Sequence, residues 1–203
     1  MIAIVDYGVG NIGSIVNMFK RLGKENVVFT NCEKEIRKAD KLLLPGVGAY
    51  DRGMKCLNNS GLIPIIESAV FTDKKPLLGI CLGMQLLTKG SEEGILPGLG
   101  FIDAETVSFS FPENSYNKVP HMGWNTVNVQ KKNPIIDEAI EERFYFVHSY
   151  HVQCNNPADI LANTVYGIPF TSAIQHDNIF ATQFHPEKSH KFGMNLLKKF
   201  AEL

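Results

Sequence analysis

A cysteine held between two glycines is the residue of this sequence best suited to covalent chemistry. Residues 79–83 read Gly-Ile-Cys-Leu-Gly, with a continuous apolar run before them and a helix-forming run after them. This is the spacing of a nucleophile elbow, in which the glycines leave room for a strained turn from strand to helix. The helix N-terminus lowers the pKa of a thiol, and the backbone N–H of Leu82 points to where an oxyanion would form. We interpret Cys81 as a nucleophile; the alternative is a buried structural cysteine.

A histidine near the end of the chain can serve as the base that such a nucleophile needs. His185 follows a predicted strand over residues 179–182, so it lies at the carboxyl edge where open α/β sheets place their ligands. Glu187 can accept a hydrogen bond from the imidazole and fix its tautomer, which is the orienting role in a catalytic triad. The alternative is a His-Pro turn that leads into the last helix. The cysteine elbow in the same chain favours the catalytic interpretation.

Two glycine-containing loops could approach a ligand closely. Residues 45–48 read Pro-Gly-Val-Gly and follow a predicted strand, so they lie at the same sheet edge as the elbow and can present backbone N–H groups. A simple strand-ending turn is the alternative. Residues 8–10 read Gly-Val-Gly but lack the third glycine of a dinucleotide fingerprint, so that match is weak.

Three further residues have a spacing that could suggest a metal ion. They are His148, His151 and Cys154. They fall in a predicted strand, in which residues three apart face opposite sides. We therefore expect no metal site.

The elements that must position these residues alternate in the first half of the chain. Short apolar runs predict strands, and apolar residues at close to a 3.6-residue period predict helices between them. This alternation is typical of a parallel, doubly wound sheet with right-handed crossovers and helices on both faces. The predicted strands are 2–6, 27–30, 41–44 and 76–80, and the predicted helices are 11–22, 33–38, 62–71 and 82–88.

The second half is rich in strands joined by short turns, so we expect some of them to be antiparallel. No linker, repeat or low-complexity tract interrupts the chain, which favours a single domain over residues 1–203. A helix over 188–202 closes the chain, with four apolar side chains on one face. The predicted strands of this half are 101–109, 125–129, 144–147, 160–164, 171–174 and 179–182.

Composition excludes several function classes. The 203 residues carry 20 basic and 21 acidic side chains, so no basic excess exists to neutralise nucleic-acid phosphates. No apolar run approaches the ~18 residues of a membrane helix. The apolar run at the start ends at Asp6, which is too short for a signal peptide. The four cysteines contain no Cys-x-x-Cys pair, which predicts reduced thiols and a cytoplasmic location.

Together the elbow, the His-Pro-Glu end and the Pro-Gly-Val-Gly loop resemble class I (triad) glutamine amidotransferases. Within that family the chain is most similar to the glutaminase subunits of imidazole glycerol phosphate synthases, and the similarity runs over nearly its whole length. The segments that carry this closer resemblance are 6–11, 91–94, 120–125 and 146–150. The resemblance implies a flavodoxin-like fold and the conversion of glutamine to glutamate and ammonia through a glutamyl thioester, with no cofactor and no metal.

The resemblance also implies a role for each matching residue. Cys81 would be the nucleophile, His185 the base and then acid, and Glu187 its orienter. The other implied residues fall into three groups: the backbone of Val47, Gly48 and Leu82 in the oxyanion hole; Gln85, Glu93, Ser149 and Tyr150 around glutamine; and Met122, Trp124, Asn125 and Lys188 at a partner interface.

The implied partner is a cyclase subunit with a (β/α)-barrel fold, joined to this chain as a heterodimer. It would receive ammonia through a dry route and form imidazole glycerol phosphate and AICAR in histidine biosynthesis. The opening Gly-Asn-Ile-Gly-Ser at residues 10–14 departs from the usual Gly-Asn-Leu-Arg-Ser and is similar to a paralogous branch. That branch supplies ammonia to a cyclase-like partner for amidino groups on surface sugars. A cysteine peptidase-like hydrolase is a further alternative, since it would also use an elbow cysteine and a histidine.

Overall fold

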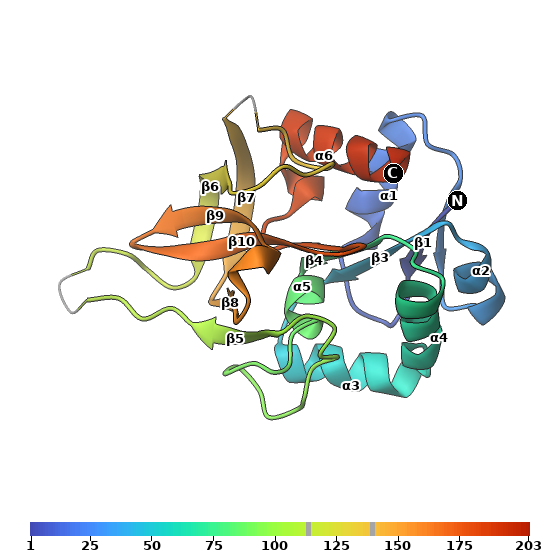
Figure 1. Cartoon of the computed structure of the whole chain (residues 1–203), viewed down its shortest axis with the longest axis horizontal. Helices are drawn as coiled ribbons and strands as arrows, with labels where there is room; N and C mark the ends of the chain where they lie inside the picture. The colour runs from blue at the N-terminus through green and yellow to red at the C-terminus, as the bar shows by residue number, and fades with distance from the viewer. Residues whose placement is uncertain (113–114, 139–140) are drawn as a thin grey trace.

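The central sheet changes from parallel to antiparallel part-way across the molecule (Figure 1). The computed structural model describes residues 1–112, 115–138 and 141–203. Its strand order is β2-β1-β3-β4-β11-β10-β9-β6-β7, and β5 pairs with β8 beside β10. The strands are β1 (Ile2–Val5), β2 (Val27–Thr30), β3 (Lys41–Gly46), β4 (Leu77–Cys81), β5 (Ala104–Ser108), β6 (His121–Val129), β7 (Glu142–His148), β8 (Tyr150–Cys154), β9 (Ile160–Tyr166), β10 (Ile168–His176) and β11 (Ile179–Thr182).

Helices cover both faces of the parallel half of the sheet. α1 and α6 pack on one face, and α2 to α5 pack on the other. The α-helices are α1 (Ile12–Arg21), α2 (Glu33–Lys38), α3 (Tyr50–Ser60), α4 (Ile63–Glu67), α5 (Leu82–Leu86) and α6 (His190–Glu202). A π-helical turn η1 (Ser68–Thr72) extends α4, and η2 (Pro157–Asp159) and η3 (Pro186–Lys188) are short 3-10 helices.

The parallel half explains the continuous apolar runs of the sequence. β2, β1, β3, β4 and β11 pair in parallel, and the residues of β1, β4 and β11 are all buried. Successive side chains of a strand point to opposite faces, so both faces of a covered sheet must be apolar. In β1, Ala3 and Val5 belong to the core under α2 to α5, while Ile2 and Ile4 belong to the core under α1 and α6.

The antiparallel half is built from hairpins that continue the same sheet. β10 pairs with both β9 and β11, β9 pairs with β6, and β6 pairs with β7. The tight β9–β10 turn places Gly167 at φ +71°, in the left-handed region that glycine adopts without steric cost. The α/β architecture predicted from the sequence, with antiparallel strands in the second half, is therefore confirmed.

Helix α3 is the main element that the sequence analysis missed. Its buried residues, Tyr50, Gly53, Met54 and Leu57, do follow the i, i+3, i+4, i+7 spacing of a helix face. Polar residues and a glycine within the helix hide this pattern. Gly53 is needed for packing, because a Cβ there would lie 2.9 Å from a methyl group of Leu82 in α5.

The chain bends at Ser149, which corrects one step of the sequence analysis. β7 ends at His148 and β8 begins at Tyr150, so His148 and His151 are not in one straight strand. Their rings both contact Phe109, with centroid distances of 5.3 and 4.8 Å. The prediction that His148 and His151 face opposite sides is therefore wrong, although no group of three or more candidate metal ligands comes together in the described residues.

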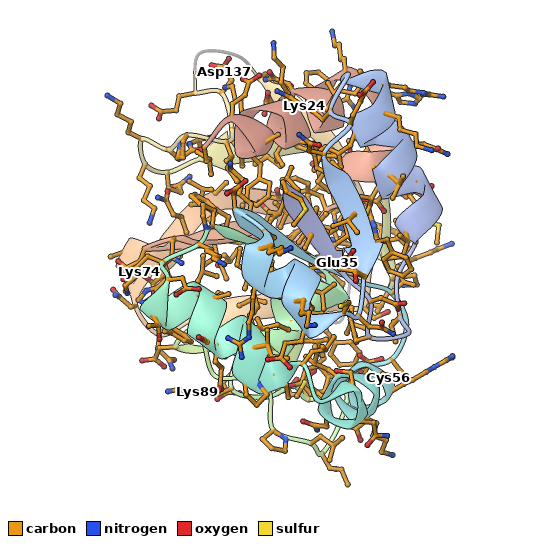
Figure 2. The ribbon with its side chains drawn as sticks, turned by 90° about the vertical axis from the view of Figure 1, so that its right-hand side faces the viewer. Lys24, Glu35, Cys56, Lys74, Lys89 and Asp137 are labelled. Carbon is orange, nitrogen blue, oxygen red and sulfur yellow. The ribbon has the colours of Figure 1, made fainter. Side chains whose placement is uncertain are left out.

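Charged side chains lie mainly on the outside. Lys74 and Lys89 are exposed and project from the edge of the molecule in the view of Figure 2. All four cysteines are free thiols. None of the helices within the described part of the chain is both long and apolar enough to cross a membrane.

The packing of α5 against β3 leads to a stability prediction. A Cβ on Gly83 would overlap the carbonyl oxygen of Leu44. Gly83→Ala should therefore lower the free energy of unfolding by about 1–3 kcal/mol, as overpacked cores do. Gly13→Ala is the control, because nothing lies within 4 Å of a Cβ there and alanine favours the helix. Urea denaturation measures both variants, and equal stability would contradict the close approach.

Candidate active site

Cys81 lies at the sharp turn between β4 and α5. It ends the strand and precedes the helix, with φ +54° and ψ −109°. This backbone conformation is strained for a residue with a side chain, so the surrounding structure must hold it in place. Gly46 lies opposite Cys81 in the sheet, and a Cβ there would be 2.8 Å from the Gly83 nitrogen. The predicted elbow is thus present, and small residues on both sides of it allow the turn.

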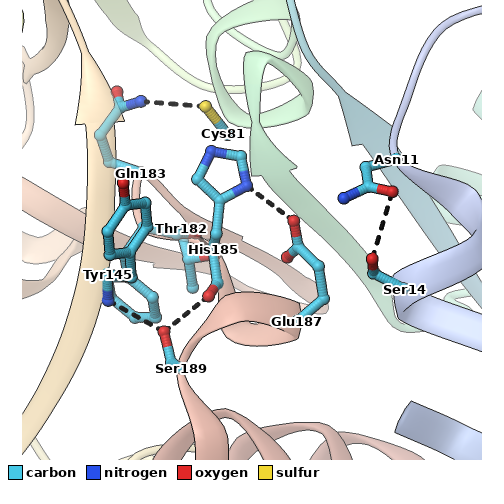
Figure 3. A network of polar contacts seen from close by, with 10 residues as sticks. Asn11, Ser14, Cys81, Tyr145, Thr182, Gln183, His185, Glu187 and Ser189 are labelled. Carbon is cyan, nitrogen blue, oxygen red and sulfur yellow. Dashed lines mark hydrogen bonds and ion pairs between the residues drawn. The ribbon is translucent and has the colours of Figure 1, made fainter. Parts of the chain in front are cut away.

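His185 reaches the same edge of the sheet as Cys81. β4 and β11 are parallel neighbours with Ile80 opposite Thr182, so the residues that follow each strand meet. The His185 Nδ1 is 2.8 Å from a carboxylate oxygen of Glu187, and both side chains are buried. Figure 3 shows the imidazole between Cys81 and Glu187, with its other ring nitrogen toward the sulfur.

The surroundings of His185 favour its charged form. Burial lowers the pKa of this histidine, but the neighbouring Cys81 thiol and Glu187 carboxylate outweigh burial and raise the pKa to about 10. The Nε2 atom makes no hydrogen bond of normal geometry with a described group. Catalytic contacts are often long before substrate binds and shorten in the complex. The arrangement suits an imidazolium beside a sulfur nucleophile.

The backbone of His185 is tied to β7. Its N–H donates to the Tyr145 carbonyl over 2.9 Å. The Ser189 hydroxyl donates to the His185 carbonyl over 2.6 Å and accepts from the Tyr145 N–H over 2.9 Å (Figure 3). These three bonds fix the position of the imidazole relative to the antiparallel half of the sheet.

One pocket of about 390 Å³ is lined by ten of the fourteen residues to which the resemblance gives a role. Glu187 lies behind His185, outside the lining. Gly48 has φ +97°, so its place at the rim requires a glycine. The predicted residues that line the pocket are Val47, Gly48, Cys81, Leu82, Gln85, Glu93, Ser149, Tyr150, His185 and Lys188, and Pro120, Val147 and His148 complete the lining.

A glutamine that the sequence analysis missed links the pocket wall to the sulfur. The Gln183 Nε2 is 3.8 Å from the Cys81 Sγ, and the residue is fully buried. Gln85 donates from its Nε2 to the Gln183 Oε1 over 3.2 Å and to the Tyr150 carbonyl over 3.3 Å. A polar residue directly after the apolar strand β11 is the signal that could have identified Gln183.

Glu93 sits on the opposite wall, in a loop held by the start of α3. Its carboxylate accepts a hydrogen bond from the Tyr50 N–H over 3.1 Å. Asp51 fixes the continuation of that loop by accepting from the N–H groups of Ile95 and Leu96, at 3.0 and 3.1 Å. The missed helix α3 therefore positions one of the predicted glutamine-binding residues.

The predicted interface residues fall into two places. Met122 and Trp124 are 61% and 40% exposed, and the Trp124 indole stacks on His190 at a centroid distance of 5.5 Å. The Lys188 amine lies 5.7 Å from the ring centre of Tyr145, next to this pair. Asn125 is on the opposite side of β6, where its amide donates to the Val165 carbonyl.

Comparison with known proteins identifies the family. The profile of the family described as glutamine amidotransferase class-I matches residues 3–203. The chain is 56% identical over 201 residues to the imidazole glycerol phosphate synthase subunit HisH 2 of Methanococcus maripaludis, with 98% of each chain covered.

The chain belongs to the class-I glutamine amidotransferase family. This amidotransferase is also 50% identical over 204 residues to the imidazole glycerol phosphate synthase subunit HisH 2 of Pseudomonas aeruginosa, with 100% of both chains covered. A crystal structure of a glutamine amidotransferase shares its fold with a TM-score of 0.74 at 18% identity, covering 98% of this chain and 97% of that one. The structure of PurLQS from Thermotoga maritima gives a TM-score of 0.72 at 15% identity, covering 99% and 97%.

The variant Glu187→Gln should be less active than the wild type, and its stability should depend less on pH. Glu187→Gln keeps the side-chain shape but removes the charge, so the pKa of His185 should fall from about 10 toward 6.5. A raised histidine pKa contributes stability that is complete below pH 6.5 and is lost as the pH rises to about 10. The free energy of unfolding should fall less steeply across that range in the variant than in the wild type.

Exposed Glu35 in α2 offers a matched control, Glu35→Gln. Loss of a triad orienter lowers turnover by up to about 10⁴-fold, so Glu187→Gln should hydrolyse glutamine far more slowly than the control. Urea denaturation at several pH values and glutamate release measure the two effects. Equal turnover in both variants would remove Glu187 from the mechanism.

Proposed function

We propose that this amidotransferase is the glutaminase subunit of an imidazole glycerol phosphate synthase. It would form a heterodimer with a (β/α)-barrel cyclase and supply ammonia for imidazole glycerol phosphate and AICAR formation. Full-length identities of 56% and 50% to HisH subunits support this assignment. The meeting of Cys81 and His185 in one pocket with Gln85 and Glu93 is the observation that carries it.

The proposed reaction divides the hydrolysis of a poor electrophile into two steps. The Cys81 sulfur attacks the carboxamide carbon of glutamine, and N–H groups of Leu82 and the Val47–Gly48 peptide bind the oxyanion. His185 gives a proton to the leaving nitrogen, so ammonia departs and a glutamyl thioester remains. His185 then takes a proton from water, whose oxygen displaces the sulfur and releases glutamate. Glu187 holds the imidazole in the required tautomer.

The polar atoms of the pocket support glutamine as the substrate. Both N–H groups of Gln85 are already used, by Tyr150 and Gln183, so the atom it has left is an acceptor. That oxygen and the Glu93 carboxylate suit the α-ammonium group of an amino acid. Ser149 and Tyr150 line the other side of the pocket.

The proposal gives residues 45–48 control of the oxyanion hole. The Tyr7 hydroxyl donates to the Pro45 carbonyl over 2.5 Å, which anchors one end of this segment. Gly48 allows the peptide before it to turn its N–H toward or away from the pocket. One oxyanion donor is worth ~10²–10³ in rate, so this peptide can keep the isolated chain a poor glutaminase until a partner docks.

The surface beside the pocket suits a partner that receives ammonia. Ammonia becomes protonated in bulk water and loses its nucleophilicity, so a covered route is required. Met122, Trp124 and Lys188 lie next to the site, and exposed aromatic residues are frequent interface anchors. We place the cyclase on this surface.

One segment supports a second ammonia acceptor. The Gly-Asn-Ile-Gly-Ser opening of residues 10–14 is similar to the paralogous branch that supplies amidino-sugar synthesis. The two HisH relatives described above carry the number 2 in their names, which fits more than one such protein in an organism. Ammonia transfer assayed with a histidine-pathway cyclase and with a cyclase-like partner separates the two acceptors.

Family membership favours glutamine over a peptide as the substrate.

Cys81→Ala should abolish glutamine-dependent synthesis by the complex. Synthesis from added ammonium should continue, because the cyclase needs only ammonia. Cys32→Ala is the control, since that thiol is exposed and distant in sequence from the site. Product formation with each nitrogen source measures the effect. Glutamine hydrolysis at the wild-type rate by Cys81→Ala would disprove the nucleophile assignment.

Trp124→Ala should leave the isolated chain folded but weaken partner binding about 30-fold, the effect expected of an interface anchor. Phe29→Ala is a matched control, because Phe29 is an aromatic residue of similar exposure on the distant strand β2. The measurements are the melting temperature of the chain alone and the glutaminase rate against cyclase concentration. An unchanged activation curve, or a chain that no longer folds, would exclude the interface role.

A further inference from the structure

Two buried histidines lie at the wall of the glutamine pocket, and the proposed reaction uses neither: His148 lines the pocket, and His121 contacts His148. His121 and His148 are 3% and 6% exposed. His121 stacks between Tyr166 and Phe146 at centroid distances of 4.1 and 4.8 Å. Buried imidazoles keep their nitrogens paired, so the partners of these rings determine what they do.

The hydrogen bonds of the two rings have a single consistent direction. The His148 Nδ1 is 2.7 Å from the Tyr150 carbonyl, which only accepts, so the proton is on Nδ1. The Nε2 of a neutral His148 is then an acceptor, and the His121 Nδ1, 2.9 Å away, must be its donor. The Nε2 of His121 in turn accepts from the amide of Asn125 over 3.3 Å.

The amide of Asn125 fixes the outer end of this relay. Its second N–H donates to the Val165 carbonyl over 2.9 Å, and its oxygen accepts from the Thr126 N–H over 2.8 Å. The orientation of the amide is therefore determined without reference to the histidines. Every bond from Asn125 to Tyr150 then has one donor and one acceptor.

The inner end of the relay reaches the nucleophile. The Tyr150 carbonyl accepts from His148 and also from Gln85, which lines the pocket. Gln85 donates to Gln183, whose amide nitrogen is 3.8 Å from the Cys81 sulfur. The chain of contacts thus runs from β6 through the pocket wall to the elbow.

The relay requires both rings to be neutral. A proton on the Nε2 of His148 would face the Nδ1–H of His121. A proton on the Nε2 of His121 would face the amide N–H of Asn125. Burial lowers the pKa of His121 to about 4 and that of His148 to about 3, and the neighbouring histidines contribute to the second shift. Neither ring is therefore suited to transfer a proton near neutral pH, so their role is to hold atoms in place.

We propose that His121 is a positioning residue for the glutaminase reaction. Through His148 it fixes the Tyr150 carbonyl, and so orients Gln85, Gln183 and the Cys81 sulfur. This role rests on the proposed glutaminase function. His121 would therefore act on the glutamine site, whereas its neighbours Met122 and Trp124 lie on the exposed surface proposed for the partner.

The first test is spectroscopic and uses the unaltered chain. ¹⁵N NMR of labelled histidines should show His121 and His148 neutral, with hydrogen on Nδ1 and a bare Nε2, from about pH 6 to about pH 8. A proton on the Nε2 of His148, or an imidazolium signal from either ring, would overturn the relay.

The second test compares variants in the complex with the cyclase. His121→Phe keeps a ring against Phe146 and Tyr166 but removes the donor to His148. We expect kcat/KM for glutamine to fall about five- to ten-fold, the effect of one buried hydrogen bond, while ammonium-dependent synthesis is unchanged. His121→Asn supplies an N–H near the position of Nδ1 and should restore most of the loss.

Phe111→Leu is the control for ring packing, because Phe111 contacts Phe109 and Tyr166 but makes none of the relay bonds. If the wild type is active and His121→Phe matches this control, the positioning role is wrong and the glutaminase function stands. Failure of His121→Asn to restore kcat/KM would also overturn the role. If the wild type releases no glutamate, the proposed function fails, and the NMR tautomers still decide whether the relay exists.

Discussion

The close approach of α5 to β3 is the constraint on which the site depends. At Gly83 there is no room for a side chain between α5 and the Leu44 carbonyl. At Gly46 there is none between β3 and the elbow. Cys81 has a positive φ, a strained conformation that such tightly packed surroundings can hold in place. The sulfur is thereby fixed at the carboxyl edge of the sheet. His185 reaches that edge because β11 lies beside β4, on the side away from β3.

The two halves of the sheet contribute different parts of the site. The parallel half supplies the proposed nucleophile, the proposed base and the glycine segment, all from the ends of adjacent strands, as open α/β sheets do. The antiparallel half supplies the facing wall, where the bend at Ser149 brings His148 and Tyr150 to the same pocket. A purely parallel sheet would leave that side of the pocket open.

What could be read from the sequence was local. The elbow around Cys81 and the His185–Glu187 pair each lie within a few residues, so spacing alone indicates them. Spacing does not reveal the roles of Gln183 and His121, because these come from contacts with residues 102 and 27 positions away. The only local signal for Gln183 is its polar side chain directly after an apolar strand. The bend at Ser149 was missed for a related reason: the second strand, β8, is defined by its pairing with β5. The glycine in α3 obscured a helix that tertiary packing selects.

The proposed triad has two separate anchors in the sheet, because His185 is attached to β7. His185 and Glu187 sit on one short segment, so their 2.8 Å hydrogen bond moves as a unit. That segment is fastened to the backbone of Tyr145, and Tyr145 pairs across the hairpin with Trp124. Cys81 is instead the last residue of β4 and lies opposite Gly46 of β3. A displacement of the Trp124–Tyr145 pair would therefore move His185 and Glu187 together relative to Cys81. In the proposed triad, the imidazole–sulfur separation is therefore the distance that joins two separately anchored parts.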